Sequence, residues 1–197
     1  MKDNMEEIKQ YAKDNYIPIV RDNTAKKLIE ICKSASVKSI LEIGTAIGYS
    51  GLLMLNNSNA NLYTIEKDKD RAFLAKENFS KYCLNKRVTL VINDAEDELI
   101  KLIKLNKKFD LIFLDGAKGQ YIKYYQSLKS LLNPSGILFA DNIYLHGLVN
   151  SDQPIKHKHR TMVNNLRKFI SQLESDNSFE TNFYDIDDGF SISILKN

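Results

Sequence analysis

Two apolar segments of this chain each end in an aspartate, and this pairing is the feature that most constrains the fold. The first segment runs from Leu111 to Asp115 and the second from Ile137 to Asp141. A strand that is buried on both faces of a parallel sheet has an unbroken apolar sequence. The two carboxylates are therefore expected at the carboxyl edge of a sheet, where open α/β folds bind their ligands.

Strands and helices alternate through most of the sequence, which predicts a doubly wound α/β fold with a mostly parallel sheet. Two helices, over 5–15 and 22–35, are expected before this alternation begins. The expected strands are 38–43, 61–65, 88–92, 109–114 and a fifth that follows a turn at 133–136. The expected helices are 50–55, 68–82, 95–105, 121–132 and 161–173. The apolar positions are Phe73, Leu74 and Phe79 in 68–82, and Met162, Leu166, Phe169, Ile170 and Leu173 in 161–173.

The C-terminal part of the chain departs from the alternation. Segments 179–186 and 190–195 are expected to be strands, and Asp187-Asp188-Gly189 between them is a hairpin turn signal. A hairpin at this position makes the last strand antiparallel. The length of 197 residues predicts a single domain, with N-terminal helices in 1–36 and the sheet core in 37–197.

Composition points to a soluble cytoplasmic protein. The N-terminus is polar, and no apolar run approaches the ~18 residues of a membrane span. Cys32 and Cys83 are the two cysteines, too few for a disulfide framework, so a reducing compartment is expected.

The charges of the chain are unevenly distributed. Between Ser151 and Lys168 there are five Lys or Arg residues and one acid, Asp152. Two explanations fit this segment equally well. One is a charged face in contact with solvent, and the other is a basic patch that faces an anionic partner such as RNA. His157 and His159 within this segment do not share a helical face, so a metal site there is not expected.

The loop between the first strand and its helix has the features of a cofactor site. Gly44 and Gly48 permit close backbone approach, whereas Ala46 breaks the dinucleotide pattern, which requires a glycine there. Glu66 ends the second strand, where a carboxylate can accept hydrogen bonds from ribose hydroxyls. Asn93-Asp94-Ala95 ends the third strand, where a polar group can meet an adenine edge. Together these positions predict an adenosine ligand.

The next two strands end in groups suited to a metal. Asp115, Asp141 and Asn142 offer the hard oxygen ligands that Mg²⁺ prefers. Lys118 follows Asp115 by three residues, which favours a role beside the metal over that of a solvated loop lysine.

On these residues the chain resembles the class I S-adenosylmethionine-dependent methyltransferases, and within them the metal-dependent O-methyltransferases of the catechol and caffeoyl-CoA type. The resemblance implies a Rossmann-like, seven-stranded sheet with an antiparallel last strand and often a homodimer. It implies S-adenosylmethionine and Mg²⁺, or another divalent cation, as cofactors, with Lys118 and Asp115 catalytic. The cofactor residues it implies are Val20, Glu42, Gly44, Ser50, Glu66, Asp94, Ala95 and Asp115. The metal ligands it implies are Asp115, Asp141 and Asn142.

Residues 156–163 and 165–167, with 17–20, look like the bacterial tRNA 5-hydroxyuridine methyltransferases, which convert the wobble base to 5-methoxyuridine. This finer resemblance implies a tRNA anticodon loop as substrate. Phosphate contacts would come from Lys156, Lys158 and Arg160, and an aromatic side chain would stack on the base. Candidates for that stacking are Tyr121, Tyr144 and Phe190, although packing in the core or on the surface is favoured for each of them individually.

Two other functions remain open on the sequence. The first is methylation of a small catechol or phenol. The second is a non-catalytic module that binds S-adenosylmethionine or RNA, although the complete metal and lysine positions disfavour it. A nicotinamide dehydrogenase is disfavoured by Ala46.

Overall fold

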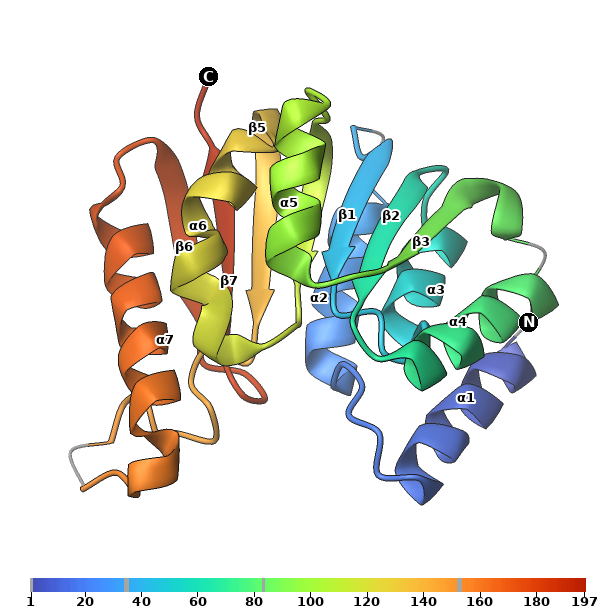
Figure 1. Ribbon diagram of the computed structural model, residues 1–197, viewed down its shortest axis with the longest axis horizontal. Helices are drawn as coiled ribbons and strands as arrows, with labels where there is room; N and C mark the ends of the chain where they lie inside the picture. Colours follow the sequence, from blue (N-terminus) through green and yellow to red (C-terminus); the bar gives the residue numbers. More distant parts are fainter. Residues whose placement is uncertain (1, 34–35, 83, 152–153) are drawn as a thin grey trace. The chain divides into compact units, whose positions relative to one another are not determined.

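The computed structural model describes residues 2–33, 36–82, 84–151 and 154–197 (Figure 1). The chain divides into two compact units, one up to Ala95 and one from Glu96 onward, and each is described by itself. No helix in the described ranges is both long and apolar enough to cross a membrane.

The first unit is built around three parallel strands. Its elements are α1 (Lys2–Asp14), α2 (Asp22–Cys32), β1 (Ser39–Ile43), α3 (Tyr49–Asn56), β2 (Asn61–Glu66), α4 (Lys69–Lys81), η1 (Asn85–Arg87) and β3 (Val88–Ile92). Strand β2 pairs in parallel with β1 on one side and with β3 on the other. The alternation of strands and helices therefore gives the parallel pairing that the sequence predicts.

Helix α4 shows where periodicity alone misassigns a face. Asp68 caps the helix as expected, because its carboxylate accepts from the backbone N–H groups of residues 70 and 71. The buried positions are Ala72, Ala75 and Phe79, whereas Phe73, predicted to lie on the apolar face, is 61% exposed. Two alanines share the buried side with Phe79, so of the two phenylalanines only one marks the side that packs inward.

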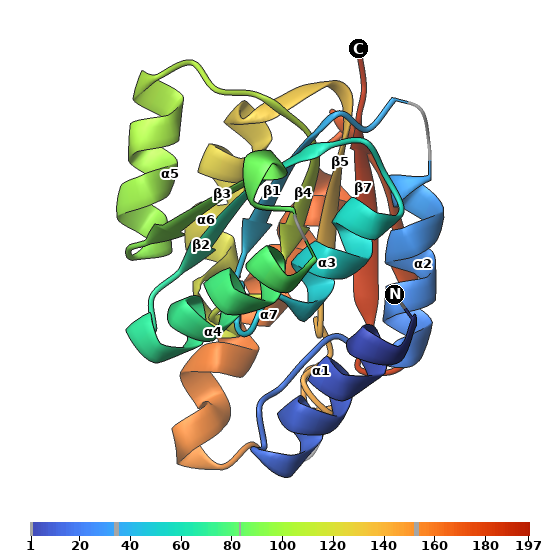
Figure 2. The same cartoon turned by 90° about the vertical axis from the view of Figure 1, so that its right-hand side faces the viewer.

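The second unit contains β4 (Phe109–Leu114) and β5 (Leu132–Asp141), which pair in parallel, and the strands β6 (Phe179–Tyr184) and β7 (Phe190–Leu195). Strand β7 pairs antiparallel with both β5 and β6, as the predicted hairpin requires. The helical elements of the unit are α5 (Ala95–Lys104), η2 (Lys118–Gln120), α6 (Tyr121–Ser130) and α7 (His157–Ser175). Figures 1 and 2 show α6 and α7 side by side in this unit.

The turn predicted at 133–136 is not a separate turn but an irregularity within β5. Phe109 pairs with Leu132 and Leu111 pairs with Ile137, so β5 has extra residues where β4 has one. Ser135 has a φ of 58° at this point. The turn-forming residues bulge out of the strand, while pairing continues on both sides.

Helix α7 begins at His157 rather than at Thr161, so the basic segment forms its first turn. Its fully buried positions are Val163, Leu166, Phe169 and Leu173. Of the predicted face, Met162 and Ile170 are only partly buried.

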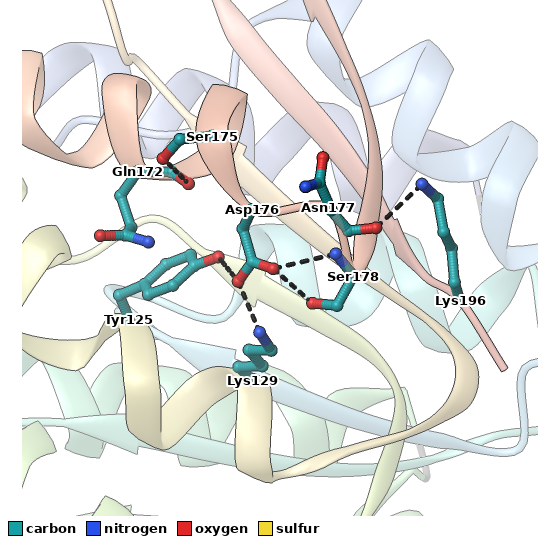
Figure 3. Close-up of polar contacts among 8 residues, drawn as sticks. All are labelled: Tyr125, Lys129, Gln172, Ser175, Asp176, Asn177, Ser178 and Lys196. Atoms are coloured by element: carbon teal, nitrogen blue, oxygen red, sulfur yellow. Dashed lines mark hydrogen bonds and ion pairs between the residues drawn. The ribbon is translucent and has the colours of Figure 1, made fainter.

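The C-terminal end of α7 is fixed by the carboxylate of Asp176 (Figure 3). It accepts hydrogen bonds from the Tyr125 hydroxyl at 2.6 Å and the Lys129 ammonium at 2.5 Å. The hydroxyl and backbone N–H of Ser178 donate to its other oxygen. One carboxylate thus joins α6 to the turn between α7 and β6.

Candidate functional site

The glycine loop of the first unit is a tight turn that is tied to the end of β2. Gly44 and Gly48 have φ values of 97° and 84°, in the left-handed region that favours glycine. The backbone N–H groups of Gly44 and Thr45 donate to the Ile65 carbonyl at 3.0 and 3.3 Å. Both glycines therefore have a conformational role in this turn, and their close approach to a ligand stays a prediction.

Glu66 connects this loop to the start of α4. Its carboxylate accepts from the backbone N–H groups of Ala46 at 2.8 Å and of Lys67 and Asp68 at 2.9 Å each. An ionised carboxylate has about four acceptor positions, so these three bonds leave room for a further donor. These bonds hold the carboxylate in place at the end of β2, and its role in binding ribose hydroxyls stays a prediction.

Glu42 lies completely buried on β1 and is satisfied by neutral donors. The hydroxyl of Ser50 donates to one of its oxygens at 2.5 Å, and that of Thr64 donates to the other at 2.6 Å. Thr64 is also 2.5 Å from the hydroxyl of Thr45 in the glycine loop. Glu42 and Ser50 thus contact each other, and the network holds the loop. Sequence reasoning missed both threonines, although a polar residue within an apolar strand was a signal for Thr64.

Three other predicted cofactor residues lie at the edges of this unit. Val20 is buried in the segment before α2. The carboxylate of Asp94 forms an ion pair with Lys67 at 2.9 Å. Ala95 is the first residue of α5.

The second unit brings Asp115 and Asp141 to the same edge of its sheet. Leu114 pairs with Ala140, so the next residues, Asp115 after β4 and Asp141 at the end of β5, lie side by side. Lys118 reaches back from η2, and its ammonium is 2.9 Å from the Asp115 carboxylate. The lysine side chain is only 23% exposed, which is not the environment of a solvated loop lysine.

Burial raises the pKa of Asp115, and the charge and hydrogen bond of Lys118 oppose that rise. Burial also raises the pKa of Asp141, and the negative charge of Asp115 raises it further. The backbone N–H of Asn142 donates to Asp141 at 2.8 Å and acts in the opposite direction. The buried carboxylate of Asp141 and the partly buried carboxylate of Asp115, which is 18% exposed, therefore repel each other, and the Lys118 ammonium offsets part of this negative charge.

This donor set fits a hard divalent cation. The described residues hold no cluster of three or more His, Cys, Asp or Glu side chains, so a metal here would rely on two carboxylates and an amide oxygen. Mg²⁺ retains several waters and is commonly held by only one or two carboxylates. Asn142 has a φ of 54°, which asparagine tolerates well, and the chain turns sharply directly after Asp141.

The aromatic residues considered for base stacking differ in exposure. Tyr121 is fully buried, and its hydroxyl donates to the carbonyls of Leu114 at 3.0 Å and Asp141 at 3.2 Å. Phe190 is 1% exposed and lies within the core. Both side chains pack in the core, which is the role favoured for each of them, and neither can stack on a substrate base. Tyr144 is partly exposed and lies against Gly189, where any side chain would collide with its ring.

The basic residues proposed for phosphate contact all lie at the start of α7. Lys156 is its N-cap and Lys158 and Arg160 are in its first turns, all three exposed. Arg160 donates to the Ile155 carbonyl at 3.2 Å. The first turn holds no acidic residue and the N-cap makes no side-chain hydrogen bond.

The cysteines add no reactive group to this picture. Cys32 is buried, and burial raises the pKa of its thiol to about 12, with the charge of Glu42 as a smaller cause. Cys83 lies outside the described residues.

Comparisons with known proteins identify one family along almost the whole chain. The family profile described as O-methyltransferase matches residues 2–196. A catechol O-methyltransferase of Niastella koreensis is 29% identical over 90% of this chain and 82% of its own. The structure of a Staphylococcus aureus protein provisionally named a caffeoyl-CoA O-methyltransferase superposes with a TM-score of 0.88 at 32% identity, over 97% of this chain and 91% of its own.

A third similar protein was solved with a product of the cofactor bound. The SAH-bound methyltransferase PaMTH1 of Podospora anserina has a TM-score of 0.79 and 27% identity, over 91% of this chain and 80% of its own. The expected fold class, a Rossmann-like α/β methyltransferase with a mostly parallel sheet and an antiparallel last strand, is confirmed by these neighbours.

Proposed function

The chain belongs to the O-methyltransferase family, and we propose that it transfers a methyl group from S-adenosylmethionine to an acceptor hydroxyl beside Asp115, Lys118 and Asp141. The enzyme class expected from the sequence is confirmed at the level of the family. The observation that carries the site assignment is a buried carboxylate and a partly buried one at adjacent strand ends, with a lysine 2.9 Å from the second.

The reaction we propose is an in-line displacement, in which the acceptor oxygen attacks the methyl carbon and the sulfur leaves. A divalent cation held by Asp115, Asp141 and Asn142 would lower the pKa of the acceptor hydroxyl and fix its position. Lys118 would accept the hydroxyl proton or stabilise the oxyanion that forms. The ends of β4 and β5 place Asp115 and Asp141 side by side, and such positioning supplies much of the rate in a two-substrate reaction.

For the acceptor we propose 5-hydroxyuridine at the wobble position of tRNA. The support is the first turn of α7, where Lys156, Lys158 and Arg160 are exposed and no acid offsets them. Positive side chains at a helix N-terminus are unfavourable with the helix dipole, so a bound phosphate would stabilise this end of the helix. Partly exposed Tyr144 remains the aromatic candidate for stacking on the base.

The direct test is mass spectrometry of tRNA from cells with and without this gene. The proposal expects 5-methoxyuridine to disappear and 5-hydroxyuridine to accumulate when the gene is absent. Unchanged 5-methoxyuridine would remove this acceptor and leave the methyl-transfer chemistry standing. Binding of tRNA should weaken steeply with salt, and a triple Lys156→Ala, Lys158→Ala, Arg160→Ala variant should show a shallower salt dependence.

A small phenol is the second candidate acceptor, favoured by the similarity to the catechol O-methyltransferase of Niastella koreensis. The purified enzyme, supplied with labelled S-adenosylmethionine, would be offered catechol and a 5-hydroxyuridine-containing anticodon stem-loop in competition. Preferential methylation of catechol would favour the small-molecule function. Transfer to neither acceptor would favour a non-catalytic binding module.

A further inference from the structure

The turn that carries Lys118 has little support of its own. Element η2 is three residues long and has no side-chain N-cap hydrogen bond. Its backbone is closed by the Gln120 N–H, which donates to the Ala117 carbonyl at 2.8 Å. Gly119, at its centre, has no side chain to pack. Short 3₁₀ turns have poor hydrogen-bond geometry, so the position of Lys118 depends on what lies against this turn.

Helix α7 supplies that support through one side chain. The amide of Asn165 donates to the Gly119 carbonyl at 2.7 Å. The backbone of Met162 also lies against the turn, because a Cβ placed on Gly119 would be 3.8 Å from the Met162 Cα. The carbonyl of the residue after Lys118 is thus held by a helix that is distant in sequence.

The helix is itself fixed to the segments that flank the carboxylates. Phe169 of α7 packs edge-on against Tyr121, with ring centroids 5.5 Å apart. The Tyr121 hydroxyl donates to the backbone carbonyls at the ends of β4 and β5. Arg167 donates to the carbonyls of Val149 at 2.9 Å and Ser151 at 3.0 Å, in the loop after β5. Helix α7 therefore contacts both η2 and Tyr121, which is bonded to the strand ends beside Asp115 and Asp141.

We propose that Asn165 is a positioning residue that holds η2, and with it the ammonium of Lys118, in the geometry needed for methyl transfer. This inference rests on the proposed role of Lys118. The ammonium of a lysine sits on a flexible four-carbon stem. A shift of the Lys118 backbone would therefore change the contact between its ammonium and the Asp115 carboxylate. A displacement of about 1 Å in a catalytic group can cost on the order of 10²-fold in rate.

The test compares Asn165→Asp with Asn164→Asp. The first change keeps the shape of the side chain but replaces the amide donor with an acceptor, and the second makes the same charge change at the neighbouring exposed position. Loss of this partly buried hydrogen bond predicts a decrease in kcat of about tenfold for Asn165→Asp, with the Kd for S-adenosylmethionine unchanged. The Asn164→Asp variant should match the wild type in both.

Hydrogen exchange gives a readout that does not depend on activity. The backbone N–H of Gln120, which closes the turn, should exchange faster in Asn165→Asp than in Asn164→Asp, because the turn opens more often. A second variant, Asn165→Leu, removes the donor without adding a charge that could pair with Lys118, and it should show the same two effects. Wild-type kcat and Gln120 exchange in both Asn165 variants would overturn the inference, as would a parallel loss of cofactor affinity.

Catechol and the 5-hydroxyuridine stem-loop are the acceptors in these kcat measurements. The Lys118→Ala variant distinguishes a failure of this inference from a failure of the proposed function. If Lys118→Ala retains full turnover, the proposed role of the lysine fails. If Lys118→Ala is inactive while both Asn165 variants are normal, only the role of Asn165 fails.

Discussion

Two buried carboxylates, Glu42 in the first unit and Asp141 in the second, have opposite surroundings. Both are at most 1% exposed. Glu42 accepts from two hydroxyl groups, and one of them, that of Thr64, also contacts Thr45 in the glycine loop. Asp141 accepts from one backbone N–H and faces a second carboxylate, Asp115, whose charge raises its pKa. The first arrangement holds a loop, whereas the second gathers negative charge of the kind that a cation would neutralise.

The largest effect should come from Lys118→Ala, which removes the cation paired with Asp115. Loss of a proton acceptor at the reacting oxygen predicts a decrease in kcat on the order of 10²–10⁴-fold. Isothermal titration should show nearly unchanged affinity for S-adenosylmethionine. Turnover within a few-fold of the wild type would contradict the assigned role.

Added Mg²⁺ should stabilise the protein through the second unit. At 100-fold above its Kd, an ion that binds only the folded state contributes about 2.7 kcal/mol. Thermal unfolding would measure the increase in Tm for the wild type and for Asp141→Asn, which should show little increase. Thr64→Val, which alters the Glu42 network instead, is the matched control and should keep the full increase. An equal increase in Asp141→Asn would rule out this pair as the metal site.

Thr64→Val should act on the cofactor loop of the first unit. It leaves Glu42 with one hydroxyl donor fewer and breaks the contact with Thr45, at a cost of roughly 1–3 kcal/mol in unfolding free energy. Because the loop loses its anchor, affinity for S-adenosylmethionine should fall several-fold. Thr64→Ser keeps the hydroxyl and should restore most of both quantities. Full affinity in Thr64→Val would show that the network does not hold the loop.

Asp176 tests whether the difference between Glu42 and Asp141 comes from their hydrogen-bond donors or from the unit to which each belongs. It belongs to the second unit, yet four donor groups surround its carboxylate (Figure 3). Burial acts to raise the pKa of Asp176, but hydrogen bonds from Lys129, Ser178 and Tyr125 outweigh it and hold that pKa well below its usual range. The side chain is 12% exposed, so Asp176→Asn should cost a modest amount, roughly 1–2 kcal/mol in unfolding free energy.

The pH dependence gives this last prediction a sign. Since the folded-state pKa of Asp176 is lowered, its contribution is complete above the unfolded-state pKa of about 3.9 and is lost as the pH falls through the folded-state value. Denaturant unfolding should therefore show the difference between wild type and Asp176→Asn at pH 6 to 7 and a shrinking difference below about pH 4. Glu174→Gln, an equal charge change at an exposed site on α7, should show neither effect.

Much of this arrangement was predictable because local signals agreed with the tertiary outcome. The apolar runs that end at Asp115 and Asp141 form neighbouring parallel strands, and their carboxyl ends lie side by side. The glycine loop and the C-terminal hairpin followed from local turn chemistry. Where packing overrode local signals, the predictions were wrong, as for exposed Phe73 and for the turn residues within β5.

By itself, the sequence determined the class of fold and the strand ends where chemistry gathers, because apolar runs and turn residues act over short distances. Only the tertiary structure decided that Tyr121 is a buried support and that Thr64 satisfies Glu42. It also decided that Asn165 reaches the turn of Lys118. Each of these contacts joins residues far apart in the chain, and such a partner is set by how helices and strands pack, which no local pattern encodes.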